Sequence, residues 1–170
     1  MFDVGEIVIH ENLQFNDNSY DEKENRPCVV LFCIEKDDRW LVCTAPLTSS
    51  IRSFNKKPHK YCLIPEVVYN YKKLNFVSLE NIGLHTEKDT QSAEIHISED
   101  EVKKIIERFK RYKPHTDKLK GMYDEIMEYI SYTELVEEKN EKEIAKELKR
   151  ERKLKIRNAK RGFVQENKGF

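Results

Sequence analysis

The first 97 residues show apolar stretches of strand length separated by polar turns. Residues 4–9 form one such stretch, and residues 28–34 form an almost wholly apolar run that is typical of a strand buried on both faces. The polar residues 36–39 predict a hairpin turn that leads into a strand over 40–45. Short strands at this close spacing indicate a mostly antiparallel barrel or sandwich. Further strands are predicted over residues 61–64, 75–79 and 82–85.

At residue 98 the period of the apolar positions lengthens from about 2 to about 3.6 residues, which predicts helices. Ser98 and Glu101 form a capping-box pattern, and Pro114 ends the first predicted helix. A second helix begins near Thr116. From about residue 137 the chain becomes rich in Glu, Lys and Arg, and this stretch is typical of a solvated helix with i,i+4 ion pairs. The apolar positions are Val102, Ile105, Ile106, Phe109 and Tyr112 in the first helix and Leu119, Met122, Tyr123, Ile126 and Ile130 in the second.

Two polar segments interrupt the predicted strands. Residues 11–25 are acidic and rich in Asn and Asp, and loops of this length in a compact domain are usually functional or disordered. We expect this segment to line a binding groove and to move when an inhibitor binds. Residues 48–60 are predicted to form a second loop, which is basic.

The composition adds a charge asymmetry to this pattern. A chain of 170 residues fits one domain, or one small domain with an appendage. Charged residues make up 36% of it, above the usual fraction of about 25%, so part of the chain is expected to be solvated helix or tail. The net charge is zero, but residues 1–97 hold 11 Lys/Arg and 15 Asp/Glu, whereas residues 98–170 hold 20 and 16.

The cysteines point to a reducing compartment. They are scattered through apolar stretches without a Cys-x-x-Cys pair, so we expect buried free thiols and no zinc site. The chain has no signal-peptide pattern and no apolar run approaching about 18 residues. The sequence therefore predicts a cytoplasmic protein with no metal, no cofactor and no membrane association. The four cysteines are Cys28, Cys33, Cys43 and Cys62.

Four short segments carry the motifs of a known family. Residues 5–8 read Gly-Glu-Ile-Val, residues 25–31 read Asn-Arg-Pro-Cys-Val-Val-Leu, and residues 45–49 read Ala-Pro-Leu-Thr-Ser. With residues 75–82, Asn-Phe-Val-Ser-Leu-Glu-Asn-Ile, they resemble, in order, the strand and turn motifs of the MazF/PemK/Kid toxin superfamily, whose members have the CcdB/Kid-type barrel.

The resemblance divides the chain in two. It covers residues 1–112 and implies a small SH3-like β-barrel with one docked helix. Residues 113–170 have no counterpart in the compact members, and we expect them to form a helical extension with a basic, partly frayed end. The predicted fold class is therefore α+β: a mostly antiparallel barrel followed by C-terminal helices, the last long and highly charged.

The resemblance also implies an activity. It indicates the toxin of a toxin–antitoxin module, a metal-independent endoribonuclease that cleaves single-stranded RNA. In the family, the arginine of the Arg-Pro motif and the threonine of the Pro-Leu-Thr-Ser motif act on the scissile phosphate; these are Arg26 and Thr48 here. When a 2′-OH attacks the adjacent phosphorus, charge gathers on the non-bridging oxygens, which a guanidinium can bind with two hydrogen bonds. A general acid must protonate the leaving oxygen, and His59 is the candidate that the residues themselves offer.

A related branch, the ToxN-like toxins, also fits. These proteins carry extra C-terminal helices and the same Ala-Pro-Leu-Thr-Ser turn, and the resemblance implies that Ser49 shares the catalytic work. The lysine expected two residues beyond this serine is Ile51 here, and Arg52 is a shifted substitute.

Basic and aromatic residues near the turn are candidate RNA contacts, since cations bind phosphates and aromatic rings stack on bases. The same residues are also compatible with an ordinary turn and a solvated loop tip. His10 and His85 are expected to be structural or exposed. The substrate-binding candidates are Arg52, Phe54, Lys56, Lys57, His59 and Lys60, with Tyr20 in the long polar segment.

Two other classes of function remain open. CcdB-like proteins share the barrel but bind a topoisomerase and cut nothing, because a fold does not fix a function. A third class is an inactive barrel that serves as a nucleic-acid-binding platform, with the basic residues 147–161 as part of it. The partners expected for the toxin are single-stranded RNA, a protein or RNA antitoxin and, unless the extra helices cover the dimer face, a second copy of the chain.

Overall fold

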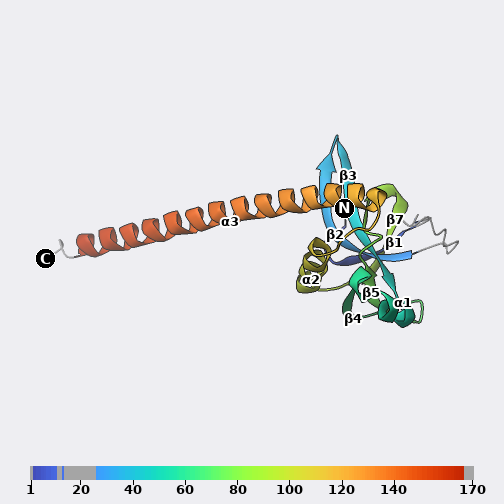
Figure 1. Ribbon diagram of the computed structural model, residues 1–170. Coiled ribbons are helices and arrows are strands. Elements are labelled where there is room, and N and C mark those ends of the chain that lie inside the picture. Colours follow the sequence, from blue (N-terminus) through green and yellow to red (C-terminus); the bar gives the residue numbers. More distant parts are fainter. Residues whose placement is uncertain (1, 11–12, 14–25, 167–170) are drawn as a thin grey trace. The chain divides into compact units, whose positions relative to one another are not determined.

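The computed structural model describes residues 2–10, 13 and 26–166 of the chain. Within this part, a run of strands with short helical turns is followed by two longer helices (Figure 1). The strands are β1 (Glu6–His10), β2 (Arg26–Lys36), β3 (Arg39–Thr48), β4 (Tyr61–Tyr69), β5 (Lys72–Ser78), β6 (Gly83–Thr86) and β7 (Thr90–His96). The helices are α1 (Ile51–Lys56), α2 (Glu99–Lys110) and α3 (Asp117–Glu166), with 3-10 turns η1 (Pro58–Lys60) and η2 (Glu87–Asp89).

The strands form one antiparallel sheet. Its hydrogen-bonded order is β4-β5-β3-β2-β1-β7, and β6 pairs with the first half of β3. Among the described residues the sheet is not closed, since β4 and β7 stand at the two ends of this path. The predicted α+β class, with an antiparallel sheet followed by helices of which the last is long, is confirmed.

The β2–β3 hairpin has the turn that its sequence predicts. Asp37 and Asp38 have φ angles of 50° and 57°, and positive φ at both central residues is the requirement of a type I′ hairpin turn. The register runs from Lys36 opposite Arg39 to Cys28 opposite Pro46, with a bulge between Val30 and Phe32. Figure 1 shows the turn at one end of this hairpin, and α1, β4 and β5 near the other.

Strand β2 is buried on both faces, as its apolar run predicted. Cys28, Val29, Val30 and Leu31 are each at most 1% exposed, although successive side chains point to opposite faces. The face of Cys28 carries a cluster of Val8, Leu13, Cys28, Val30 and Val42, against which Phe2 and Cys33 pack.

The cysteines are free, and three of them are buried. Burial raises the pKa of the Cys28 thiol to about 12, and it also raises the pKa of the Cys43 and Cys62 thiols. These thiols therefore stay protonated near neutral pH and are poor nucleophiles. Cys33 is only half-buried. The prediction of buried free thiols is confirmed for Cys28, Cys43 and Cys62.

Both long helices begin where the sequence predicts. The Ser98 side chain accepts a hydrogen bond from the Glu101 amide at 3.3 Å, which caps α2. Thr116 does the same for the Leu119 amide at 3.3 Å, one residue before α3. The buried side chains of α2 are Val102, Ile105 and Phe109, and those of α3 include Leu119, Ile126 and Ile130.

Three stretches depart from the sequence prediction. Residues 48–60, predicted as a loop, contain α1 and η1, because Ser50 caps a short helix that has too few apolar residues to show a period. Strand β4 continues to Tyr69, five residues beyond its predicted end. Strand β7 was not predicted, because most of its side chains are polar and exposed, which leaves no apolar alternation to detect.

The chain divides into two units, Met1–Met127 and Glu128–Phe170. The first holds the sheet, α1, α2 and the start of α3, and the site described below lies within it. In the second, every described side chain from residue 137 to residue 155 is exposed, as expected of a charged helix. Across the described residues, we find no helix with the length and apolar character needed to cross a membrane.

Candidate functional site

Arg26 and Thr48 stand at the ends of two neighbouring strands. Arg26 is the first residue of β2, and Thr48 is the last residue of β3. Each stands two residues outward from the last pair of the ladder, Cys28 opposite Pro46. Residues that oppose each other in an antiparallel ladder share a face, with Cβ atoms about 5 Å apart. The β2–β3 ladder itself ends at Cys28 and Pro46; continued outward by two residues, its register would set Arg26 opposite Thr48.

The register extends this pair into a row across the sheet. His10 of β1 is the partner of Arg26, and Thr90 of β7 is the partner of His10. On the other side, Thr48 pairs with Phe76 of β5. The side chains of such a row share one face of the sheet. The register thus puts His10 beside Arg26 on the neighbouring strand.

A second imidazole, that of His85, contacts His10 from a strand that is not part of this row. The ring of His85, on β6, lies 4.1 Å from that of His10, centroid to centroid, with an interplanar angle of 69°. His10 is 5% exposed and His85 is half-buried, so neither is an exposed side chain. Sequence reasoning did not connect them to Arg26, because a cross-strand register is invisible in a linear sequence.

The surroundings of Arg26 lower the pKa of its guanidinium through burial, although the group remains a cation at any ordinary pH. Its neighbour Cys28 donates a weak hydrogen bond from Sγ to the Arg26 carbonyl oxygen at 3.6 Å. Partial burial of an arginine is unfavourable unless its guanidinium forms an ion pair or hydrogen bonds.

The turn after β3 orients the Thr48 hydroxyl. Its Oγ1 accepts a hydrogen bond from the Ser50 amide at 3.2 Å, so its own proton points elsewhere and is available for donation. The Ser50 hydroxyl accepts from the Ser53 amide at 3.3 Å and donates to the Ser53 Oγ at 2.8 Å, which starts α1. Ser49, between them, is exposed.

Helix α1 and η1 carry the basic candidates. The Phe54 ring stacks on that of Phe76, with the two ring centroids 4.6 Å apart. This contact fixes α1 beside the strand partner of Thr48. Lys60 is also engaged, by Glu80. The exposed cationic candidates are Arg52, Lys56, Lys57 and His59. Tyr20 and most of the segment 11–25 lie outside the described residues; Leu13 of that segment is buried.

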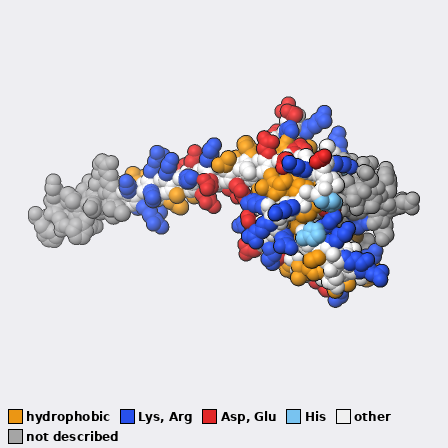
Figure 2. All heavy atoms as spheres, viewed as in Figure 1, with side chains coloured by type: hydrophobic (Ala, Val, Ile, Leu, Met, Phe, Trp, Pro, Cys, Tyr) orange, Lys and Arg blue, Asp and Glu red, His pale blue; other side chains and the backbone are white. Residues whose placement is uncertain are grey.

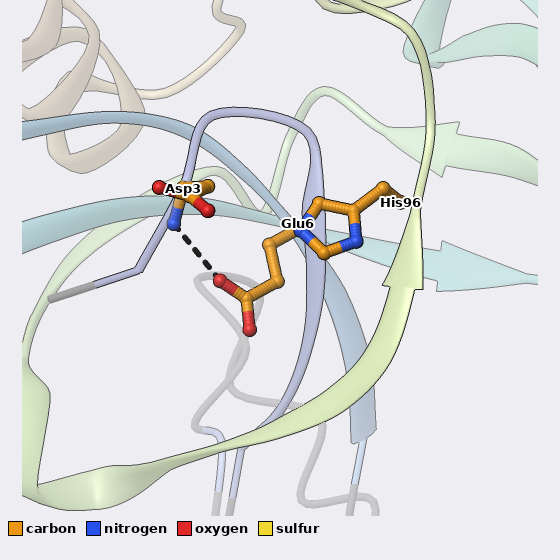
Figure 3. A group of neighbouring side chains, drawn as sticks. All are labelled: Asp3, Glu6 and His96. Atoms are coloured by element: carbon orange, nitrogen blue, oxygen red, sulfur yellow. Dashed lines mark hydrogen bonds between the residues drawn. The ribbon is translucent and has the colours of Figure 1, made fainter.

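In the part of the chain that the structure describes, one group of side chains has the composition of a metal site. Asp3, Glu6 and His96 bring their potential ligand atoms within 4.8 Å of one another. Figure 3 shows the Glu6 carboxylate turned toward the Asp3 backbone, whose amide donates to it at 2.9 Å. This trio lies at the opposite end of β1 from His10 and is separate from the Arg26–Thr48 row.

Comparison with known proteins adds no assignment to this geometry. No family model matches the chain, and no curated protein matches it. The case for a function therefore depends on the motifs, on the cross-strand register and on the chemistry of the row.

Proposed function

We propose that this chain is a metal-independent endoribonuclease of the MazF/PemK type, the toxin of a toxin–antitoxin module, and that Arg26 and Thr48 act on the scissile phosphate of single-stranded RNA. The observation that carries the proposal is the β2–β3 register, which ends at Cys28 opposite Pro46 and, continued by two residues on each strand, would set Arg26 opposite Thr48. They come from two motifs that are 22 positions apart in the sequence.

The proposal includes the SH3-like barrel of that family. Strong curvature of the sheet supports it. Strands β1 and β6 are separated by β2 and β3, and strands in a flat sheet stand about 4.8 Å apart, which would put them about 14 Å from one another. The His10 and His85 rings nevertheless lie 4.1 Å apart, so this sheet must bend toward its own interior.

The chemistry follows from the donors of the row. The 2′-oxygen attacks phosphorus and the bond to the 5′-oxygen breaks, which yields a 2′,3′-cyclic phosphate and a free 5′-hydroxyl. Arg26 binds the oxygens that become negative, and the Thr48 hydroxyl donates a further hydrogen bond to them. A preorganised donor of this kind typically contributes about 3–4 kcal/mol to the barrier reduction.

Proton transfer is assigned to the histidine beside the pair. The leaving 5′-oxygen needs a proton, and general acid catalysis contributes about 10²–10⁴-fold. Arginine is a poor proton donor because its pKa is high. His10 is the register partner of Arg26, and His85 adjoins it, whereas His59 is on η1. We therefore prefer His10 to His59 as the general acid.

The test is RNA cleavage in EDTA. Arg26→Gln and Thr48→Val are each expected to slow cleavage about 10²–10³-fold, since each removes one donor from the transition state. Thr48→Ser keeps the hydroxyl and is expected to retain activity. Arg39→Gln is the matched control, because it removes one exposed positive charge at the other end of β3. Mass spectrometry should identify the cyclic phosphate.

Three results would contradict this function. They are cleavage that requires a divalent ion, cleavage of DNA at the same rate, and unaltered cleavage by the Arg26 and Thr48 variants. RNA that is bound but left intact would favour the nucleic-acid-binding platform, which the exposed cations of α1 beside Thr48 also support. Intact RNA together with a bound topoisomerase subunit would favour the CcdB-like class.

A further inference from the structure

A basic pocket lies on the first unit, and none of its lining residues belongs to the Arg26–Thr48 row. It has a volume of about 280 Å³ and is lined by His59 of η1 and by Arg108, Arg111, Tyr112 and Lys113 at the end of α2. These two segments are about fifty residues apart in the sequence, so the fold assembles the pocket. Figure 2 shows Lys and Arg side chains gathered on the visible face over α2 and around α1.

No salt bridge in the described ranges neutralises the cations of this pocket, although Arg111, after Lys110, contributes to the lowered pKa of the Glu107 carboxyl. Within the described residues, Arg108, Arg111 and Lys113 make no ion pair. The nearby carboxylates have other cations: Glu80 binds Lys60 at 2.7 Å and faces His115 at 3.4 Å, and Glu107 binds Lys110 at 2.8 Å. The pocket is therefore positive, and three like charges close together are unfavourable unless an anion joins them.

Tyr112, one of the lining residues, has a buried hydroxyl whose pKa is raised to about 12 by burial and by the charge of Glu80. Tyr112 is 5% exposed, and its hydroxyl has no hydrogen-bond partner among the described residues. Its ring is fixed by Phe109 and Tyr123, with centroids 6.5 Å away in both cases. Buried hydroxyls are nearly always hydrogen-bonded in folded proteins, so the Tyr112 hydroxyl is a candidate donor to a ligand of this pocket.

We infer that this pocket binds a phosphate group, held by the guanidinium groups of Arg108 and Arg111 with the Lys113 ammonium and a hydrogen bond from the Tyr112 hydroxyl. Two planar guanidinium groups and one hydroxyl match the tetrahedral arrangement of phosphate oxygens. The ligand is either a free or terminal phosphate or a phosphodiester of a nucleic-acid backbone. The inference goes beyond the proposed function, because the pocket can bind phosphate whether or not the chain cuts RNA.

The experiment measures binding without cleavage. The probes are inorganic phosphate and two single-stranded DNA oligonucleotides of one sequence, with a 5′-phosphate or a 5′-hydroxyl, since DNA lacks the attacking 2′-OH. Arg26→Gln serves as the background, so that the row does not contribute. The double variant Arg108→Gln/Arg111→Gln is expected to raise Kd at least about tenfold for the probe that the pocket binds. Tyr112→Phe, which keeps the ring, is expected to raise it severalfold.

Lys103→Gln is the matched control, because Lys103 is an exposed cation of the same helix outside the pocket. If the pocket takes a terminal phosphate, inorganic phosphate and the 5′-phosphorylated strand bind and the variants abolish the preference for that strand. If it takes a backbone phosphate, both strands bind equally, and the double variant lowers the slope of log K against log salt by about 0.7 for each phosphate that the pocket no longer neutralises.

Two outcomes would overturn the inference. In one, the double variant changes Kd no more than Lys103→Gln does, which would mean that the general positive charge of α2, and not the pocket, binds the probe. In the other, Tyr112→Phe and the double variant both bind every probe like the parent, with unchanged circular dichroism. Loss of RNA cleavage by Arg26→Gln does not bear on either outcome, so failure of the pocket and failure of the nuclease are distinguishable.

Discussion

Lys60 differs from the other basic residues around α1 because a carboxylate fixes its ammonium. Both Glu80 oxygens accept hydrogen bonds from Lys60 Nζ, at 2.7 and 2.8 Å, and the two side chains are only 11–13% exposed. The Lys60 backbone is also engaged, since its carbonyl accepts from the Leu79 amide at 2.9 Å. The sequence placed Lys60 among the RNA contacts; in the structure its contacts with Leu79 and Glu80 join η1 to the residues that follow β5.

The prediction at this residue separates stability from binding. Lys60→Met should lower the free energy of unfolding by about 3 kcal/mol, because it leaves the buried Glu80 carboxylate without its main cation. Lys57→Met, at an exposed position, should change it by less than about 0.5 kcal/mol. Urea unfolding measures both. A Lys60→Met protein that unfolds like the parent but loses more RNA affinity than Lys57→Met would return Lys60 to the binding surface.

At the scale of elements, the period of the apolar residues predicts where most strands and helices lie. The sequence does not predict how the strands pair with one another. The run 28–34 and the cap at Ser98 identified β2 and α2 because burial on both faces and capping leave local signals. Strand β7 leaves none, since it is an edge strand with polar side chains. Strand pairing also leaves no local signal. Arg26 and Thr48 could be predicted from family motifs, but the position of His10 beside Arg26 is known only from the β1–β2 pairing in the structure.

Gly5 is where three elements meet. Its amide donates to the Val30 carbonyl of β2, and its carbonyl accepts from the Ile97 amide, both at 2.9 Å. Its φ is +87°, and a Cβ there would lie 2.5 Å from the Ile97 carbonyl oxygen. The Gly-Glu-Ile-Val motif thus has a backbone reason for its glycine: only a residue without a side chain allows β1 to start against β2 and the end of β7.

Gly5→Ala should therefore destabilise the protein by at least about 2 kcal/mol, since both the positive φ and the contact with a backbone oxygen are unfavourable. Gly121→Ala is the opposite case: it lies within α3, and an added Cβ would meet no atom within 4 Å. That variant should stabilise the protein by about 0.5–1 kcal/mol through helix propensity. Thermal unfolding of the two variants in one buffer compares them. Equal melting temperatures would show that the β1 junction tolerates a side chain.

At the scale of the whole molecule, the charged end of α3 can be tested for whether it contributes stability or only charge. Every described side chain from residue 137 to residue 155 is exposed, so ending the chain at residue 136 removes no described buried side chain. We expect the truncated protein to keep its free energy of unfolding within about 0.5 kcal/mol and to cut RNA in EDTA as the full chain does. Residues 147–161 carry eight Lys/Arg and two Glu, so their removal should flatten the salt dependence of RNA binding if they touch the backbone. Parallel measurements on the truncated and the full chain distinguish these roles. A loss of more than about 1 kcal/mol in the free energy of unfolding would mean that the exposed helix contributes to stability. Unchanged stability with a weaker salt dependence of RNA binding would mean that the helix contributes positive charge for binding a polyanion.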